Sequence, residues 1–303
     1  WNGTNFTIIN GSTLLFMNFD NRSALGESNT VVRDLSTYDN DGTLTGTSFI
    51  NITGGKYAGA LQVDGDSDYV HITKQVISGN KWSIGAWINP NRYGTTNYMN
   101  GVFHQAAAGA NLGTNIGVHT GATCTNCLGG RTNSHSAFVN SNSNVIALNT
   151  WQHVVMVNNA GSVTWYVNGT IVGTSSGDSR EADTAANVYI GGWYDLGVHR
   201  MFQGKIDDIN IWNHSMTQKE VYAFFSSSLT KFNNTHWELV INQTENATTN
   251  LVDGDYTYRT HAGDTFNNTN QTELRTVTFD TNSDTIPPGI NFSDNTPGND
   301  STL

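Results

Sequence analysis

The sequence predicts an all-β protein in which two antiparallel sheets pack face to face, with one short helix. Three observations predict this class. Thr, Gly and aromatic residues, which favour strands and turns, are abundant, whereas Lys and Glu are scarce. Short apolar stretches alternate with turn residues along most of the chain. Only one segment carries helix signals, so the sandwich must be made of strands.

The clearest strand is at residues 82–88, where positions 82, 84, 86 and 88 are apolar. This period of two is typical of a half-buried strand, and we expect the rings of Trp82 and Trp151 to lie inside the sandwich. Asn168-Gly169 separates two further apolar stretches. Both residues tolerate positive φ, so a type I′ hairpin is predicted there.

The helix is predicted after Thr217. Thr217-Gln-Lys-Glu220 has the spacing of a capping box, and Val221, Phe224 and Phe225 would form one apolar face. We expect a helix of about two turns that caps one end of the sandwich.

The charge excludes some partners. The net charge is -11 with 14 Lys plus Arg, and these do not cluster, so nucleic acid is not expected as a partner. No apolar run is long enough for a membrane-spanning helix, so no membrane insertion is expected within this segment. The chain begins at Trp1 without Met, so we expect a mature or excised piece whose targeting signal lies outside it.

The compartment is indicated by Asn-x-Ser/Thr sequons. The chain has more of these sequons than its Asn, Ser and Thr content would give by chance, but less than twice as many. Compositional bias therefore stays an alternative explanation. We favour an extracellular or cell-surface glycoprotein. The candidate glycosylation sites are Asn2, Asn5, Asn10, Asn21, Asn51, Asn168, Asn213, Asn233, Asn242, Asn246, Asn267, Asn270, Asn291 and Asn299.

Cys124 and Cys127 are the two cysteines and lie three residues apart in a Gly/Thr/Asn-rich loop. We expect a short-range disulfide that closes this loop. A metal site that adds His119 and His135 to the two cysteines is the alternative, because the spacing of the four residues permits it.

Four segments together resemble the laminin-G-like, concanavalin A-like jelly-roll domains, which are related to pentraxins. The resemblance covers about residues 13–226 and implies a jelly-roll sandwich. The segments are Gly54-Gly-Lys-Tyr-Ala-Gly-Ala-Leu-Gln-Val-Asp64 through Tyr69-Val-His-Ile72, Trp82 to Pro90, Asn149-Thr-Trp-Gln-His-Val-Val155 with its hairpin, and Val188-Tyr-Ile-Gly-Gly192 to Asp208-Ile-Asn-Ile-Trp212.

The C-terminal flank resembles immunoglobulin-like or fibronectin-type-III-like repeats of microbial surface proteins, archaeal ones included. The resemblance rests on residues 253–260 and 276–280, and strands are predicted at 236–241, 255–261 and 273–280. About 55 residues hold too few strands for a complete sandwich. We therefore hypothesise that the jelly roll is inserted into an immunoglobulin-like domain.

This hypothesis assigns each part of the chain to a domain. Residues 1–12 would supply a strand to the immunoglobulin-like domain at 227–286, with the jelly roll inserted at 13–226. Residues 287–303 would be a linker or the first strand of the next repeat. The alternative is that residues 1–12 form a flexible extension.

No catalytic residues are predicted. Jelly-roll glycoside hydrolases carry a Glu-x-Asp-x-x-Glu strand, but Ala186 stands at the second glutamate's place after Glu181-Ala-Asp183. A surface loop is therefore the interpretation of this segment. No Gly-x-Ser-x-Gly motif occurs, and His153 lies in a predicted strand, where we expect a structural histidine with satisfied hydrogen bonds.

A structural calcium ion is predicted near the start of the chain. Carboxylate and amide oxygens suit this cation, and in related domains the first and last strands lie side by side. The expected ligands are Asp20, Asp34, Asn40 and Asp208. Solvated turn residues are the alternative.

A ligand-binding loop is predicted after residue 192. Pentraxins carry an acidic calcium-binding cluster there, of which only Asp195 remains, so calcium-dependent capture of that kind is not expected. Aromatic residues suit stacking on sugar rings, with packing or protein contact as alternatives. The candidates are Trp193, Tyr194, Asp195, His199 and Arg200.

These features predict a non-catalytic adhesion or carbohydrate-binding module of a larger cell-surface or secreted protein. Its partners would be a glycan or a cell-surface protein, and neighbouring repeats by strand addition. A structural subunit of a surface layer, filament or virion is the alternative. A glycan-processing enzyme is a further alternative.

Overall fold

The structure is a computed structural model, and two compact units divide the chain, Trp1–Ile241 and Asn242–Leu303. The first unit also includes a two-stranded sheet in which β17 (Ser227–Lys231) pairs with β18 (Trp237–Ile241), and the domain bounds predicted from the sequence stay a prediction. The described residues are 11–95, 99–106, 112–184, 187–193, 200–231, 233, 237–241, 254–258, 261–263, 269–271 and 273–279.

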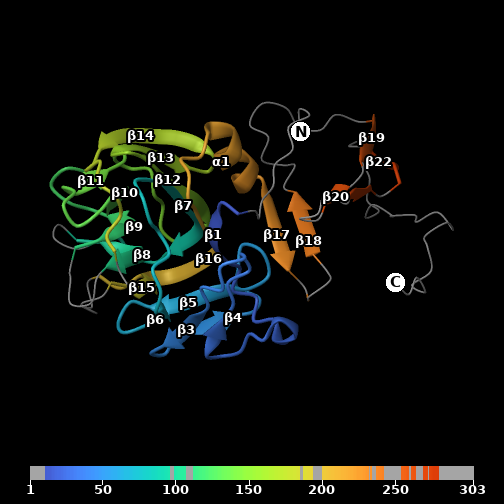
Figure 1. The fold of residues 1–303 in the computed structure, drawn as a ribbon, viewed down its shortest axis with the longest axis horizontal. Coiled ribbons are helices and arrows are strands. Elements are labelled where there is room, and N and C mark those ends of the chain that lie inside the picture. Colours follow the sequence, from blue (N-terminus) through green and yellow to red (C-terminus); the bar gives the residue numbers. More distant parts are fainter. Residues whose placement is uncertain are drawn as a thin grey trace. The chain divides into compact units, whose positions relative to one another are not determined.

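Two eight-stranded antiparallel sheets make up most of the described part of the first unit (Figure 1). Sheet A has, in order, β14 (Thr170–Ser176), β13 (Ser162–Val167), β12 (Gln152–Asn159), β7 (Lys81–Pro90), β16 (Gln203–Trp212), β5 (Ala60–Asp64) and β4 (Phe49–Asn51), and β1 (Thr13–Met17) also pairs with β16. Sheet B has β11 (Val139–Asn140), β10 (Cys127–Arg131), β9 (Thr114–His119), β8 (Asn100–Ala106), β15 (Asn187–Ile190), β6 (Tyr69–Ile72), β3 (Gly42–Thr45) and β2 (Val31–Val32). A short 3₁₀ helix, η1 (Ser23–Leu25), follows β1.

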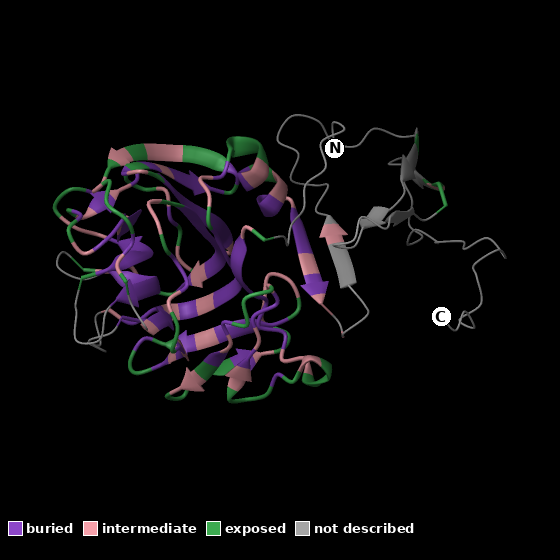
Figure 2. Ribbon diagram, viewed as in Figure 1, coloured by how far each residue is buried: buried purple, intermediate pink, exposed green. Residues whose placement is uncertain are grey.

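The core lies between the two sheets. The apolar alternation predicted for β7 is confirmed, because Trp82, Ile84, Ala86 and Ile88 all belong to the main buried cluster. Figure 2 shows buried residues throughout both sheets and exposed ones along the edge strand β14. Trp151 departs from the expectation, since it precedes β12 and is half-buried. The all-β, two-sheet class is confirmed.

The predicted hairpin and helix are both present. Asn168 and Gly169 have φ of 49° and 73° between β13 and β14, as a type I′ turn requires. Helix α1 (Gln218–Phe225) begins with the predicted capping box between Thr217 and Glu220. No helix among the described residues is long and apolar enough to span a membrane.

The second unit contains two two-stranded sheets within its described residues. They pair β19 (Gly254–Tyr258) with β22 (Arg275–Phe279) and β20 (His261–Gly263) with β21 (Thr269–Gln271). Strands thus form in the predicted stretches, but an immunoglobulin-like sandwich stays a prediction. The insertion hypothesis does too, because residues 1–10 lie outside the described ranges.

Candidate functional site

Helix α1 packs on part of the outer face of sheet A. Val155, Tyr166 and Trp212 lie on the side of the sheet opposite the core and cluster with Val221 and Phe224 of α1. The rings of Trp212 and Phe224 meet edge to face at a centroid distance of 4.9 Å. The helix therefore packs on this face. The expectation that it caps one end of the sandwich is wrong.

The outer face of sheet B carries aromatic and polar residues instead. On β6 and β15 every second residue faces the core, namely Val70, Ile72, Val188 and Ile190. The residues between them must face outward, because successive side chains of a strand point to opposite faces. His104 of β8 lies opposite Tyr189 in the register and shares this face. We call five residues the aromatic row, namely Tyr69, His71, Tyr189, His104 and Trp193.

The rings of the aromatic row touch one another. Tyr189 contacts Tyr69 at a centroid distance of 5.4 Å, and His104 stacks on Trp193 at 4.8 Å. Nε2 of His71 lies 2.9 Å from Oδ1 of Asn187, a hydrogen bond that fixes the imidazole. Tyr69 and His71 are half-buried, whereas the other three rings are buried. The row is thus open at its β6 end.

The inner end of the row is closed, and its imidazole carries no charge. Burial, followed by the positive charge of Arg200, lowers the pKa of His104 to about 3, so this imidazole is neutral at physiological pH. The Arg200 guanidinium lies over the Trp193 ring, 5.1 Å from its centroid. Such a cation–π contact holds the indole in place.

Trp193 and Arg200, two predicted ligand-binding residues, lie together at this inner end. Trp193 is only 7% exposed and lies against Gly101, where an added Cβ would come 2.4 Å from the indole Cδ1. Trp193 therefore packs, while Arg200 is half-exposed. The other predicted ligand residues, Tyr194, Asp195 and His199, lie outside the described ranges.

Several buried polar atoms on this face lack a hydrogen-bond partner among the described residues, and two of them concern the aromatic row. These two are Nε1 of Trp193 and Oδ1 of Asn115. Asn115 belongs to the same face, because it lies opposite His104 in the register. Buried polar groups are normally hydrogen-bonded, so unpartnered ones point to water or a ligand.

Residues 64–222 match the family model Laminin_G_3, described as the concanavalin A-like lectin/glucanases superfamily. The match covers more than half of the 303 residues. The chain belongs to this superfamily. No curated protein sequence matches it.

Solved structures show the same concanavalin A-like fold at low sequence identity. Domain 4 of AbnA, a GH43 extracellular arabinanase from Geobacillus stearothermophilus, solved with arabinotriose, matches at TM-score 0.53 and 20% identity, covering 70% of this chain and 97% of that one. The binding domain of Paraclostridial Mosquitocidal Protein 1 matches at TM-score 0.52 and 15% identity, covering 71% of this chain and 52% of that one. The botulinum neurotoxin serotype G binding domain matches at 0.51 and 14%, covering 70% and 50%. This chain spans about half of each toxin domain.

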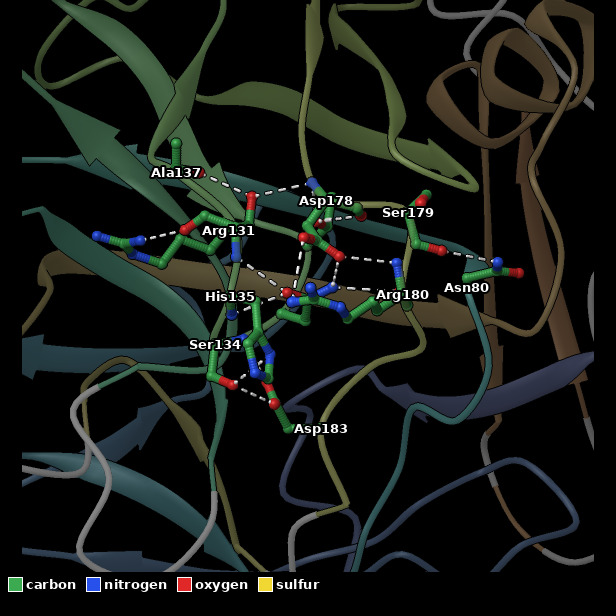
Figure 3. Close-up of polar contacts among 12 residues, drawn as sticks. Asn80, Arg131, Ser134, His135, Ala137, Asp178, Ser179, Arg180 and Asp183 are labelled. Carbon is green, nitrogen blue, oxygen red and sulfur yellow. Dashed lines mark hydrogen bonds and ion pairs between the residues drawn. The ribbon is translucent and has the colours of Figure 1, made fainter.

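The segment considered for catalysis joins two loops of the concanavalin A-like domain (Figure 3). Ser134 donates its backbone N–H and its hydroxyl to the carboxylate of Asp183, and Asn133 donates to Asp178. Glu181 is exposed. Asp183 is therefore used to hold the loop between β10 and β11 against the loop before β15.

Cys124 and Cys127 form a disulfide in this domain. The two sulfurs bond to each other, so they are not thiolate ligands for a metal. His119 packs against Phe138 at a centroid distance of 4.8 Å, and His135 is exposed. The alternative metal site of these two histidines and two cysteines therefore does not form.

The four predicted calcium ligands divide into two places. Asp34 accepts backbone N–H groups of Phe16 and Asn40, and the amide of Asn40 donates to the Leu14 carbonyl. Burial raises the pKa of Asp208 to about 7, and the charge of Asp20 adds to this rise, so Asp20 acts on Asp208. Within the described ranges no three His, Cys, Asp or Glu side chains gather as a metal site. The predicted set of four is therefore not one site.

His153 is buried, as expected, but its hydrogen bonds are not satisfied. Neither ring nitrogen has a partner in the part of the chain that is described, and the ring lies among Trp87, Phe224 and Phe225. Burial lowers its pKa to about 3.

Asn168, a predicted glycosylation site, is exposed in the hairpin turn, and its Oδ1 accepts the backbone N–H of His153.

Sequence reasoning did not assign a site role to most of the aromatic row. Tyr69 and His71 alternate with Val70 and Ile72, a signal that was used only for the fold. An aromatic or histidine residue at each outward position of a strand could have indicated a binding face. Which outer face α1 covers cannot be seen in that alternation.

Proposed function

We propose that this chain is a non-catalytic carbohydrate-binding module of a cell-surface or secreted protein, and that a sugar ring stacks at the open end of the aromatic row. The observation that carries this proposal is the pair of half-buried rings, Tyr69 and His71, backed by Tyr189 on a face that α1 does not cover. Aromatic faces and a few fixed polar groups are what sugar sites use.

The neighbours support binding as the kind of activity. One is a domain solved in complex with arabinotriose, and others are toxin binding domains. Arabinotriose is therefore a reasonable first probe. A purely structural role in a surface assembly is the competing function, and it requires no glycan affinity.

The test is a glycan array followed by calorimetry with the best array ligand and with arabinotriose. Tyr69→Ala and His71→Ala should each weaken binding at least about 10-fold, because each removes one stacking ring. Tyr222→Ala, which removes an exposed tyrosine from α1, is the matched control and should leave affinity unchanged. A correctly folded protein that binds nothing on the array, or equal affinity in all four proteins, would overturn the proposal.

A further inference from the structure

The Asn-x-Ser/Thr sequons are distributed unevenly over the first unit. Residues 52–167 contain 15 asparagines and none begins a sequon, although the share of Ser and Thr in the chain would give about three. This stretch includes five of the eight strands of sheet B. Within the described part of the chain, no sequon asparagine lies on a strand of sheet B. The described ones are Asn21, Asn51, Asn168, Asn213 and Asn233.

Asn51, at the end of β4, is closed by its own contacts. Its Nδ2, the atom to which a glycan would be attached, donates a hydrogen bond of 2.9 Å to Oε1 of Gln62 on β5. A Cβ added at Gly54 would lie only 2.4 Å from the same nitrogen, so the turn after β4 packs against it. These contacts leave no room for a sugar on Nδ2.

Asn168 has the opposite arrangement. Its Oδ1 accepts the main-chain N–H of His153 at 2.9 Å, which orients the amide, whereas its Nδ2 makes no hydrogen bond with a described residue. The residue is exposed at the tip of the hairpin between β13 and β14. A sugar on Nδ2 would therefore leave both the turn and the hydrogen bond to His153 intact.

Asn213 is open in the same way. It is exposed between β16 and the N-cap of α1, and its main-chain N–H donates to the carbonyl of Ser12. Its side chain makes no hydrogen bond with any residue that the structure describes. A glycan would therefore displace no contact of this side chain.

Both open asparagines lie beside α1. A Cβ added at Gly169 would lie 3.0 Å from side-chain atoms of Tyr222 and Phe225, so the hairpin tip touches the helix (Figure 1). The helix packs on the outer face of sheet A, while the aromatic row lies on the outer face of sheet B. These two faces point in opposite directions, because the core lies between the sheets. Glycans beside α1 would thus cover the side of the sandwich away from the row.

We propose that Asn168 and Asn213 carry N-linked glycans, that Asn51 does not, and that the outer face of sheet B is left bare for its sugar ligand. The donor would be an oligosaccharide linked to a lipid through a diphosphate, used by an oligosaccharyltransferase. The bond from the sugar C1 to the diphosphate breaks, C1 bonds to Nδ2, and Nδ2 loses one proton as the lipid diphosphate leaves. The bare face rests on the proposed function, whereas the occupancy of the three asparagines does not.

Glycopeptide mass spectrometry tests the occupancy on the full chain, secreted by a host that performs N-glycosylation. The peptides of Asn168 and Asn213 should carry a glycan in most molecules, and the peptide of Asn51 in few. Asn168→Gln and Asn213→Gln should each remove the mass of one glycan from the intact chain, whereas Asn51→Gln should remove none. An unmodified Asn168 or Asn213, or an Asn51 as fully occupied as they are, would overturn the assignment.

A sequon placed on sheet B tests the bare face. Thr43 is exposed on β3 opposite His71, so Thr43→Asn makes residues 43–45 a sequon beside the aromatic row. A glycan there should lower the affinity for the best array ligand at least about 10-fold, because it covers the open end of the row. Thr43→Gln, which creates no sequon, should bind like the parent, and so should Asn168→Gln and Asn213→Gln.

The outcomes separate this inference from the proposed function. Thr43→Cys, coupled at its thiol to a bulky maleimide, gives the same test if the new sequon is not used. Unchanged affinity of the blocked chain, or lost affinity in Asn168→Gln and Asn213→Gln, would overturn the bare face. A parent that binds no array ligand would overturn the proposed function, while the occupancy measured by mass spectrometry would still decide between Asn51 and the two open asparagines.

Discussion

The imidazole of His71 lies nearly parallel to the phenol ring of Tyr189, with centroids 5.0 Å apart and ring planes inclined by 13°. The two residues lie opposite each other on neighbouring strands of sheet B. Asn187, two residues before Tyr189, holds the other edge of the same imidazole through a hydrogen bond of 2.9 Å. One face of His71 is thus stacked and its orientation fixed before any ligand arrives.

Asn187 is therefore a positioning residue. Asn187→Ala should weaken glycan binding about 5-fold, because the imidazole loses the hydrogen bond that orients it, worth about 1 kcal/mol. Asn187→Asp keeps an acceptor oxygen and should bind like the parent. Calorimetry measures both, with thermal unfolding as a check on folding. If Asn187→Asp loses as much affinity as Asn187→Ala, the hydrogen bond is not what matters.

The absence of a side chain at Gly101 leaves room for the indole ring of Trp193. An added Cβ would lie 2.4 Å from Cδ1 and 2.6 Å from Nε1 of the indole, so Gly101→Ala must displace the ring or shift the strand. The free energy of unfolding should fall by about 1–3 kcal/mol. Gly11→Ala meets open space and is the control. Urea denaturation distinguishes them, and equal stability of both variants would contradict the packing described for Trp193.

Replacement of Trp82 tests whether the core lies between the two sheets. Its ring is fully buried in the main apolar cluster, so Trp82→Ala should cost about 3–5 kcal/mol of unfolding free energy. Ile171→Ala, at a 45% exposed position of β14, should change stability by less than about 0.5 kcal/mol. Urea denaturation of the two variants measures the difference. A small loss for Trp82→Ala would mean that its ring is not in the core.

His153 should make stability fall in acid. Its folded pKa of about 3 lies below the unfolded value of 6.5, so below pH 6.5 the unfolded chain binds a proton that the folded chain does not. The loss begins as pH falls through about 6.5 and reaches about 2 kcal/mol at pH 5. His153→Phe keeps a ring among Trp87, Phe224 and Phe225 and removes this dependence.

The measurement is the difference in unfolding free energy between His153→Phe and the parent at pH 8 and at pH 5. It should move in favour of the variant by about 2 kcal/mol at the lower pH. Asp207 and Asp208, whose pKa values burial raises, act with the opposite sign in both proteins and cancel in the difference. A difference that does not change with pH would refute the titration of His153.

The fold was predictable because its signals are local. The alternation around Trp82, the Asn168-Gly169 turn and the capping box at Thr217 each depend on residues within one element. The position of α1 was not predictable in the same way. Trp212 faces this helix rather than the core, yet an apolar outward residue has the same pattern as an inward one.

The candidate site was predictable only in part. Trp193 was singled out because it follows a recognisable strand, but its stacking on His104 joins positions far apart in the chain. The action of Asp20 on the buried Asp208 depends on the antiparallel pairing of β1 with β16 and on the register shift beside Asp208. Such register details are tertiary features, which composition and spacing do not contain.

The most direct test of the account is a map of backbone amide chemical-shift changes when the best array ligand, or arabinotriose, is added. The account predicts that the largest changes fall on Tyr69–Ile72 and Asn187–Ile190, the two strands at the open end of the aromatic row. Changes confined to α1 and β14, with these two strands unaffected, would contradict it.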